Sequence, residues 1–345
     1  MVMVVPKLED RLIESTQPIR YFTLAVSIYH LFDTGLFDVL VETGSASVGE
    51  LANRLELDEE KLEGFLKYAK NEQIVIEENG RFRLSPKGAE LGDFRGWYTM
   101  MIGGYAETFL QVGGKLKANS GWASRDSMKV GVGSCGISHY DAIPLTQSLM
   151  SRIPGGCHRL LDLGCGNGLY LVEFCKLYPD IQAWGVEPSE GGYAEAVKLV
   201  EEYGLQNRIR LTCSPAIEFF EGDFDYEPDF IVLGFVLHEI LGQDGEEGVI
   251  RFLTQITDRF PEIHIIIIEV DNRIDDPDMM NHGLAKAYYN PYYLLHYFTR
   301  QRLETEKYWD NLFARLNLTV KAKETVNHHV DSTDLTIGYL LQRGK

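Results

Sequence analysis

From residue 151 onward, short apolar runs alternate with segments in which apolar residues recur every three or four positions. Such runs are typical of buried strands, and the segments between them are typical of amphipathic helices. Strands that alternate with helices form parallel βαβ units, so residues 151–345 are predicted to form an α/β domain with a doubly wound, Rossmann-like sheet. Two further runs, at residues 317–326 and 333–342, have no helical segment between them and predict a final antiparallel pair.

The pattern before residue 95 predicts a separate helical unit that ends in a hairpin. Residues 18–40 carry apolar side chains around most of a helical face, which indicates burial against a partner surface as well as within the unit. Residues 48–84 then give helix, turn, helix and two short strands joined at ENG, which is the order of a winged helix. We therefore expect a winged-helix-like domain at residues 1–95.

Charge decides how this winged helix is interpreted. Its second helix carries more acidic than basic residues, and the whole chain of 345 residues has a net charge of −18. Nucleic acid and anionic membranes both attract clustered cations and repel such a protein. We expect no nucleic-acid or membrane partner, and we expect a dimerisation or lid role for the N-terminal domain.

Residues 96–150 are rich in aromatic residues and glycine. They fit the wall of a substrate pocket and, equally, a helical connector between domains. Five scattered cysteines without a CxxC pair indicate neither a disulfide framework nor a thiolate zinc site. No apolar run reaches the roughly 20 residues of a membrane span, and the N-terminus has no signal-peptide pattern, so a cytoplasmic location is expected.

The best local signal for chemistry is the segment LLDLGCGNG, in which glycines follow a predicted strand. Gly164, Gly166 and Gly168 let the backbone adopt positive φ and approach a ligand closely. The next strand ends at Glu187, where a carboxylate accepts hydrogen bonds from both hydroxyls of a ribose. Asp162 would repel a pyrophosphate but attract a sulfonium cation and an α-amino group.

These motifs, LDLGCGNG followed by GVEPS, resemble those of class I S-adenosylmethionine (SAM)-dependent methyltransferases. The resemblance implies that Gly164, Gly166 and Asn167 lie against the methionyl part of the cofactor SAM and that Glu187 holds its ribose. In this family the strand that follows usually ends in an acid near the adenine. Cys213, Ser214 and Ala216 stand in that region here instead, and Ser214 is included among the candidate cofactor contacts.

His238 follows the apolar run at residues 230–237, and a parallel strand there would deliver it to the carboxyl edge of the sheet, where ligands bind in open α/β folds. Three interpretations are open: a buried core histidine, a general base and a metal ligand. Small-molecule O-methyltransferases with a winged-helix domain, which this chain resembles, carry a general-base histidine after this strand. They follow it with a tryptophan and an acid, whereas here the next residues are Glu239 and Ile240.

A second resemblance covers the substrate region and the α/β domain. The segments FRGWYTMMIGGY, VGVGSCGISHYDAIPLT and FVLHEILGQDGEEGV are similar to those of metal-dependent C-methyltransferases of 2-oxo acids such as phenylpyruvate and 2-ketoarginine. It implies C3-methylation of a 2-oxo acid, most closely 2-ketoarginine, through a metal-chelated enolate, with His238 and His296 as ligands of a divalent metal. Imidazoles suit iron, zinc or nickel, and two of them leave positions free for a chelating substrate.

We favour this C-methyltransferase interpretation over O-methylation with His238 as the base, because the tryptophan expected after that histidine is missing. The resemblance and the apolar N-terminal helices also imply a homodimer formed through the N-terminal domain. Glu239 is then a candidate base or water-orienting group, and His282 is a reserve metal ligand.

The two ends of a 2-oxo acid with a guanidinium group would need different partners. Arg125 is a candidate for paired hydrogen bonds to the substrate carboxylate. The guanidinium would need an acid and an aromatic face. The candidates for that end are Trp97, Tyr105, Tyr140 and Asp141.

Overall fold

The computed structural model describes residues 7–220 and 226–344. The chain divides into two compact units, Met1–Gly103 and Gly104–Lys345. The second unit contains the sheet and all the residues of the site described below.

The first unit is mainly helical. Its elements are α1 (Leu8–Asp33), α2 (Leu36–Thr43), β1 (Ala46–Ser47), α3 (Val48–Leu55), α4 (Glu59–Asn71), β2 (Val75–Glu78), β3 (Arg81–Leu84), α5 (Pro86–Glu90), η1 (Leu91–Phe94), α6 (Arg95–Tyr98) and η2 (Thr99–Gly104). The strands form an antiparallel sheet in the order β1-β3-β2.

Local sequence signals explain the winged helix. Ser47 and Glu50 form a reciprocal capping box at the start of α3, and the Asp58 side chain caps α4. Asn79 and Gly80 both have positive φ, 53° and 75°, which matches the tight turn between two strands. The prediction of helix, turn, helix and hairpin is confirmed, and the structure adds β1 as a third strand.

Helix α1 leaves much of its apolar surface exposed. Leu8, Leu12, Ile19 and Phe22 are exposed by 77, 58, 67 and 53% respectively. At 100° per residue these four positions lie on one face of the helix. Within the described residues, no single helix is long and apolar enough to cross a membrane. Helices α1 and α2, bent by 64° at their junction, reach that length and apolar character only when they are taken together.

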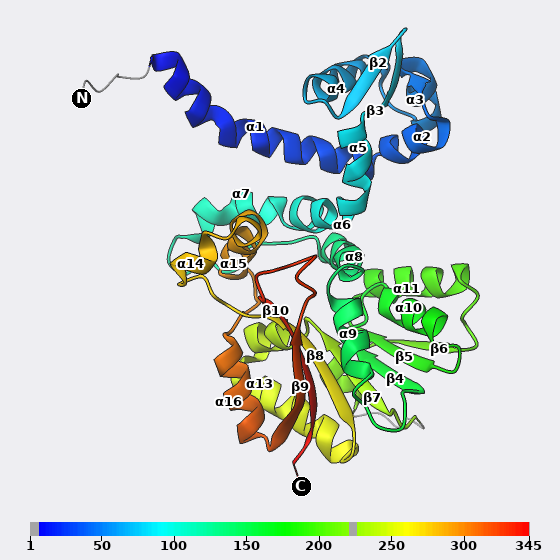
Figure 1. Ribbon diagram of the computed structural model, residues 1–345, viewed down its shortest axis with the longest axis vertical. Helices are drawn as coiled ribbons and strands as arrows, with labels where there is room; N and C mark the ends of the chain where they lie inside the picture. Colours follow the sequence, from blue (N-terminus) through cyan, green and yellow to red (C-terminus); the bar gives the residue numbers. More distant parts are fainter. Residues whose placement is uncertain (1–6, 221–225, 345) are drawn as a thin grey trace. The chain divides into compact units, whose positions relative to one another are not determined.

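The second unit contains a seven-stranded sheet (Figure 1). Its strands are β4 (Arg159–Leu163), β5 (Gln182–Glu187), β6 (Ile209–Cys213), β7 (Phe230–Gly234), β8 (His264–Val270), β9 (Leu318–Thr325) and β10 (Thr336–Arg343). Its helical elements are α7 (Ala106–Lys115), α8 (Ser127–Ser138), α9 (Ala142–Met150), α10 (Leu169–Leu177), α11 (Glu190–Glu202), α12 (Ala216–Phe219), α13 (Leu237–Arg259), α14 (Pro277–Met280), η3 (Ala285–Tyr289), α15 (Asn290–His296) and α16 (Glu306–Arg315).

The strand order is β6-β5-β4-β7-β8-β10-β9. Strands β4 to β8 are parallel, and β10 pairs antiparallel with both β8 and β9. The predicted doubly wound sheet and its final antiparallel pair are therefore confirmed. The order reverses between β4 and β7, so the loops after these two strands flank the crevice in which open α/β sheets bind ligands.

Helices cover both faces of this sheet (Figure 1). On one face, Phe252 of α13 and Trp309 of α16 pack with β-strand residues such as Ile265 in one apolar cluster. On the other, Leu145 of α9 and Phe174 of α10 belong to a second cluster. Burial on both faces explains why the central strands read as continuous apolar runs in the sequence.

Candidate active site

The loop after β4 has the backbone that its glycines allow. Gly164, Gly166 and Gly168 have φ of 93°, 55° and 77°, a region that other residues rarely adopt. A Cβ atom on Gly164 would lie 2.8 Å from the Val236 side chain, so this position also lacks room for a larger residue. The predicted role of these glycines in turning the chain closely past a ligand site agrees with this geometry.

Two buried carboxylates flank the loop. Glu187, at the end of β5, accepts hydrogen bonds from the backbone N–H groups of Gly166 and Ser189, both at 2.9 Å. Asp162 lies inside β4, where burial and the charge of Glu187 raise its pKa to about 8. Burial also raises the pKa of Glu187. Such a pair favours a cationic ligand, because a cation would stabilise both ionised forms.

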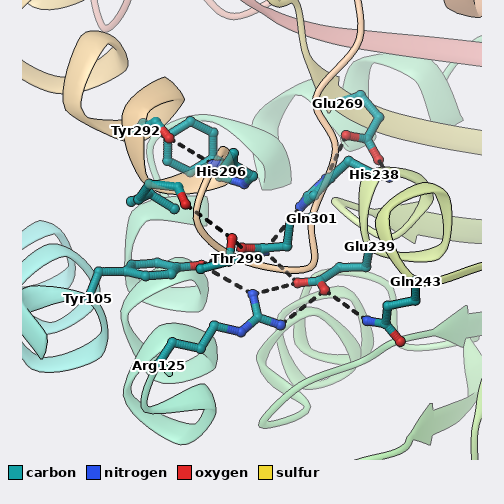
Figure 2. A network of polar contacts seen from close by, with 11 residues as sticks. Tyr105, Arg125, His238, Glu239, Gln243, Glu269, Tyr292, His296, Thr299 and Gln301 are labelled. Carbon is teal, nitrogen blue, oxygen red and sulfur yellow. Dashed lines mark hydrogen bonds and ion pairs between the residues drawn. The ribbon is translucent and has the colours of Figure 1, made fainter. Parts of the chain in front are cut away.

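His238 is fixed by a carboxylate on the neighbouring strand. Strand β7 ends at Gly234, earlier than the apolar run to residue 237 suggested, and His238 lies in the first turn of α13. Its Nδ1 lies 2.8 Å from Oε2 of Glu269 on β8, and its backbone N–H donates to Oε1 (Figure 2). Burial lowers the pKa of His238, but the charge and hydrogen bond of Glu269 outweigh it and raise that pKa.

His296, at the end of α15, presents a second buried imidazole. Its Nδ1 donates to the Tyr292 carbonyl at 2.7 Å, which leaves a lone pair on Nε2. That Nε2 is buried and has no hydrogen-bond partner among the described residues. The ring centroids of His238 and His296 are 5.3 Å apart. Burial and the charge of His238 hold the pKa of His296 well below its usual value, so this imidazole is neutral.

His296 meets a simple test for a metal ligand, whereas the Nε2 of His238 lies 3.5 Å from the side-chain nitrogen of Gln301. A neutral nitrogen lone pair that is buried without a donor is unusual, since buried polar atoms are nearly always paired. The Nδ1 of each ring is held by an oxygen acceptor, which is how metal-binding histidines are commonly oriented. The residues present therefore fit a metal ion held by two histidines.

A polar network adjoins the histidines and joins four segments of the chain (Figure 2). The Glu239 carboxylate receives hydrogen bonds from Gln301 at 2.6 Å and Arg125 at 3.0 Å. Arg125 also donates to the Tyr105 hydroxyl at 3.3 Å. Burial raises the pKa of Glu239, but the charges of His238 and Arg125 prevail and hold it below its usual value. Glu239 is thus an anion clamped between Arg125 and Gln301.

Comparison with known proteins now identifies the family. Residues 106–323 match a family described as a methyltransferase domain. Over 340 residues the chain is 39% identical to the 2-ketoarginine methyltransferase of Streptomyces arginensis, and the alignment covers 97% of each protein.

The chain is a class I SAM-dependent methyltransferase.

Solved structures agree with this fold. Human N-acetylserotonin methyltransferase, solved in complex with SAM, aligns over 100% of both chains with a TM-score of 0.68 and 14% identity. A riboflavin-derivative dimethyltransferase from Streptomyces davawensis aligns over 99% of this chain and 100% of its own, with a TM-score of 0.63 and 17% identity. At these identities the likeness shows the α/β methyltransferase fold that the sequence predicted.

The residues predicted for the cofactor follow the ends of three neighbouring strands of the methyltransferase. Asn167 accepts a hydrogen bond from the Leu169 backbone N–H at the start of α10. Ser214 follows β6, and its backbone N–H donates to the Glu187 carbonyl. Together with Asp162 and the glycines they occupy one edge of the sheet. Their individual contacts with SAM stay predictions.

The residues predicted for the substrate are spread more widely. Tyr105 and Arg125 belong to the network around Glu239, and Tyr140 and Asp141 lie at the turn between α8 and α9. Trp97 belongs to the first unit, where its ring packs against Phe94. Arg125, which the sequence assigned to the substrate carboxylate, pairs with Glu239 in this structure.

Three members of the site were missed from the sequence: Glu269, Gln301 and Tyr292. Glu269 carried a readable signal, because it is the one charged residue in the apolar run IIIIEV. A carboxylate in a buried strand needs a partner, and His238 is that partner. Gln301 and Tyr292 had no comparable signal. The place of Gln301 follows from how the segment after α15 approaches α13, and Tyr292 takes part through its backbone carbonyl.

Proposed function

We propose that this methyltransferase transfers the methyl group of SAM to C3 of a 2-oxo acid, with 2-ketoarginine (5-guanidino-2-oxopentanoate) as its substrate. The observation that carries the proposal is the buried Nε2 of His296, which has no hydrogen-bond partner among the described residues and belongs to a ring beside the His238 imidazole. The relative that is 39% identical over nearly the whole chain bears the name of this activity.

The two histidines would hold a divalent metal, with iron the first choice and zinc or nickel the others. When bound, such an ion acts as a Lewis acid that makes a proton α to a ketone easier to remove. His238 would be oriented for this task by Glu269 and His296 by the Tyr292 carbonyl.

Arg125 and Glu239 supply the charge around the reacting carbon. A substrate carboxylate would take the paired hydrogen bonds of Arg125 that Glu239 now receives. Losing that partner would raise the pKa of Glu239, so its carboxylate would become a better base. Glu239 would then accept the C3 proton, C3 would form a bond to the methyl carbon, and the sulfur–methyl bond would break to release S-adenosylhomocysteine.

The guanidinium end of the substrate has a matching set of residues. The ring centroid of Tyr292 lies 4.2 Å from that of His296 and 5.8 Å from that of Tyr288. Burial, with a contribution from Asp331, raises the pKa of Asp141 to about 7. Asp141 in turn contributes to the raised pKa of Tyr288, so the two lie close enough to interact. A guanidinium would find both an aromatic face and an acid there.

A product panel tests the proposed reaction. The purified enzyme is offered SAM with 2-oxo acids and with phenols, and the products are identified by mass and proton spectra. Methylation at C3 of 2-ketoarginine is the expected result, and methylation of a phenol oxygen alone would contradict the proposal.

The metal is tested separately by metal analysis of two variants. His296→Ala is expected to lose bound metal and activity. His282→Ala is the matched control. Its Nδ1 also has no partner in the part of the chain that the structure describes, but its Nε2 contacts the Ser332 hydroxyl at 3.1 Å. Full activity after chelation and in His296→Ala would refute the metal site.

The guanidinium end is tested with Asp141→Asn. Asparagine keeps the cap of α9 but loses the charge. We expect a KM increase of about tenfold or more for 2-ketoarginine and little change for 5-ureido-2-oxopentanoate, its neutral analogue. An equal change for both substrates would show that Asp141 has a structural role.

A second candidate function is O-methylation of a small molecule. The His238–Glu269 pair favours it, because a carboxylate on Nδ1 orients an imidazole and raises its basicity for removing a hydroxyl proton. In that case His296→Ala would retain much of the activity and chelators would have no effect.

We further propose that the protein is a homodimer formed through its first unit. The apolar face of α1 supports this, since four large side chains on one side of that helix are more than half exposed.

A further inference from the structure

A small cavity opens beside the glycine loop of the second unit. It has a volume of ≈ 90 Å³ and lies between the ends of β4 and β7 and helix α8. Its lining includes Asp162 and Gly164 from β4 and its loop, Gly234 from the end of β7, Ser134 from α8, and Tyr170 from α10. The cavity therefore adjoins the part of the glycine loop assigned to the methionyl end of SAM.

Tyr170 brings an unused hydroxyl group into this cavity. The side chain is 8% exposed, and its Oη is buried without a hydrogen-bond partner among the described residues. Ser138 is its polar neighbour on α8, but the Ser138 hydroxyl donates to the Ser134 carbonyl at 2.9 Å. The absence of a side chain at Gly234 leaves room beside this hydroxyl, because a Cβ there would lie 3.6 Å from Oη.

The buried Asp162 carboxylate lines the same cavity. The Asp162 side chain is only 3% exposed. An ionised carboxylate can accept hydrogen bonds but cannot donate them, whereas a tyrosine hydroxyl can also donate one. Ser134 also lines the cavity, and its hydroxyl is a second group that can donate. One acceptor and two donors around a small cavity complement a zwitterion.

We propose that Tyr170 is a cofactor-binding residue whose hydroxyl donates a hydrogen bond to the α-carboxylate of SAM, while Asp162 receives the α-ammonium group. Buried polar atoms are rarely left unpaired, so an Oη that lacks a partner in the protein indicates a partner in the ligand. Burial keeps the pKa of this hydroxyl well above its usual value, so it remains a donor at neutral pH. The proposal depends on SAM binding and holds for either candidate methyl acceptor.

The test compares three ligands by calorimetry on Tyr170→Phe and the unmodified enzyme. S-adenosylhomocysteine carries the whole amino-acid end, its decarboxylated analogue lacks only the carboxylate, and 5′-methylthioadenosine lacks both charged groups. Tyr170→Phe is expected to weaken S-adenosylhomocysteine binding about tenfold or more and to leave the other two affinities within about twofold.

Tyr339→Phe is the matched control. Its hydroxyl is also buried without a partner among the described residues, but the ring packs on Phe313 in the other apolar cluster. No ligand should distinguish this variant from the unmodified enzyme. Equal weakening of all three ligands by Tyr170→Phe, or unchanged binding of S-adenosylhomocysteine, would overturn the proposal. If Tyr170→Phe does not fold, the proposal is tested on the unmodified enzyme, which must bind S-adenosylhomocysteine at least about tenfold more tightly than its decarboxylated analogue. Equal binding of these two ligands would refute the proposal.

Discussion

The pKa values of His238 and His296 shift in opposite directions although the two rings are neighbours. The Glu269 carboxylate raises the pKa of His238, whereas burial and the charge of His238 lower that of His296. Nδ1 of His238 faces the Glu269 carboxylate, whereas Nδ1 of His296 donates to the neutral Tyr292 carbonyl. Of the two proposed metal ligands, His296 is therefore the better prepared, because a neutral imidazole binds a metal ion through Nε2 without first losing a proton.

Replacing Glu239 by glutamine tests its proposed role as the base. In deuterated water without SAM, the enzyme should exchange the C3 protons of 2-ketoarginine, and Glu239→Gln should slow that exchange by about 100-fold or more. Proton spectra follow the exchange directly. The control is Gln243→Ala, which removes a more exposed neighbour of the same carboxylate. Unchanged exchange in Glu239→Gln would assign the base to another group.

The raised pKa of Asp162 predicts a pH dependence of SAM binding. Below the pKa of about 8 most of the Asp162 carboxyl is protonated, and a cationic ligand binds the ionised form. The affinity for SAM should therefore increase by about tenfold between pH 6 and pH 7.5, where its ammonium group stays charged. Calorimetry at several pH values checks this, and Asp162→Asn should remove the dependence. A flat profile in the unmodified protein would contradict the assignment.

At the residue scale, the sequence predicted the residues whose place follows from a strand end. The glycine loop, Glu187 and His238 come directly after or near the ends of β4, β5 and β7, and parallel strands bring such ends together. His296 required the family resemblance, because nothing in its own helix distinguishes it. The pairing of Arg125 with Glu239 was missed, since two residues so far apart in sequence meet only through tertiary packing.

At the scale of elements, helix α13 positions the site through a close backbone contact. Gly242 lies one turn after His238, and a Cβ on it would be 2.5 Å from the Arg300 carbonyl and 2.6 Å from Cα of Gln301. The Arg302 backbone N–H also donates to the His238 carbonyl at 2.9 Å. The absence of a side chain at one position therefore lets the segment with Gln301 approach α13.

Gly242→Ala should force that segment away from α13. We expect a loss of about 1–3 kcal/mol in the free energy of unfolding and at least about tenfold in kcat/KM. Urea unfolding and steady-state kinetics measure the two effects. Gly113→Ala on α7 is the control, because a Cβ there meets nothing within 4 Å. An unchanged kcat/KM in Gly242→Ala would show that the contact does not position the site.

The periodic patterns predicted the elements well and their boundaries less well. In the sequence, residues 246–261 have the pattern of a separate helix. In the structure, α13 begins at Leu237 and continues through a break at Gly245, where φ is 71° and ψ is −175°. The sequence VLHEI reads as a continuation of the strand because its apolar residues adjoin the β7 run. The positive φ of Phe235, 59°, ends the strand in the structure.

At the scale of the whole molecule, the predicted homodimer depends on α1. Ile19 lies at the centre of the exposed apolar face, so Ile19→Glu should place a charge in the interface and give a monomer. Light scattering after size exclusion should find twice the mass of the chain for the unmodified protein. Ile13→Glu, on a different side of the same helix, should remain a dimer. A monomeric unmodified protein would refute the proposal.

The position of β10 also constrains how the chain is made. Thr336 pairs with Val270 and Ile337 with Glu269, so β10 covers one edge of β8, the strand that orients His238. During synthesis residues 271–335 must follow before that edge is paired, and an open edge of a parallel sheet is prone to pair with other chains. Strand β8 therefore leaves the ribosome before its partner strand, so the strand that orients His238 keeps an open edge until β10 has been made.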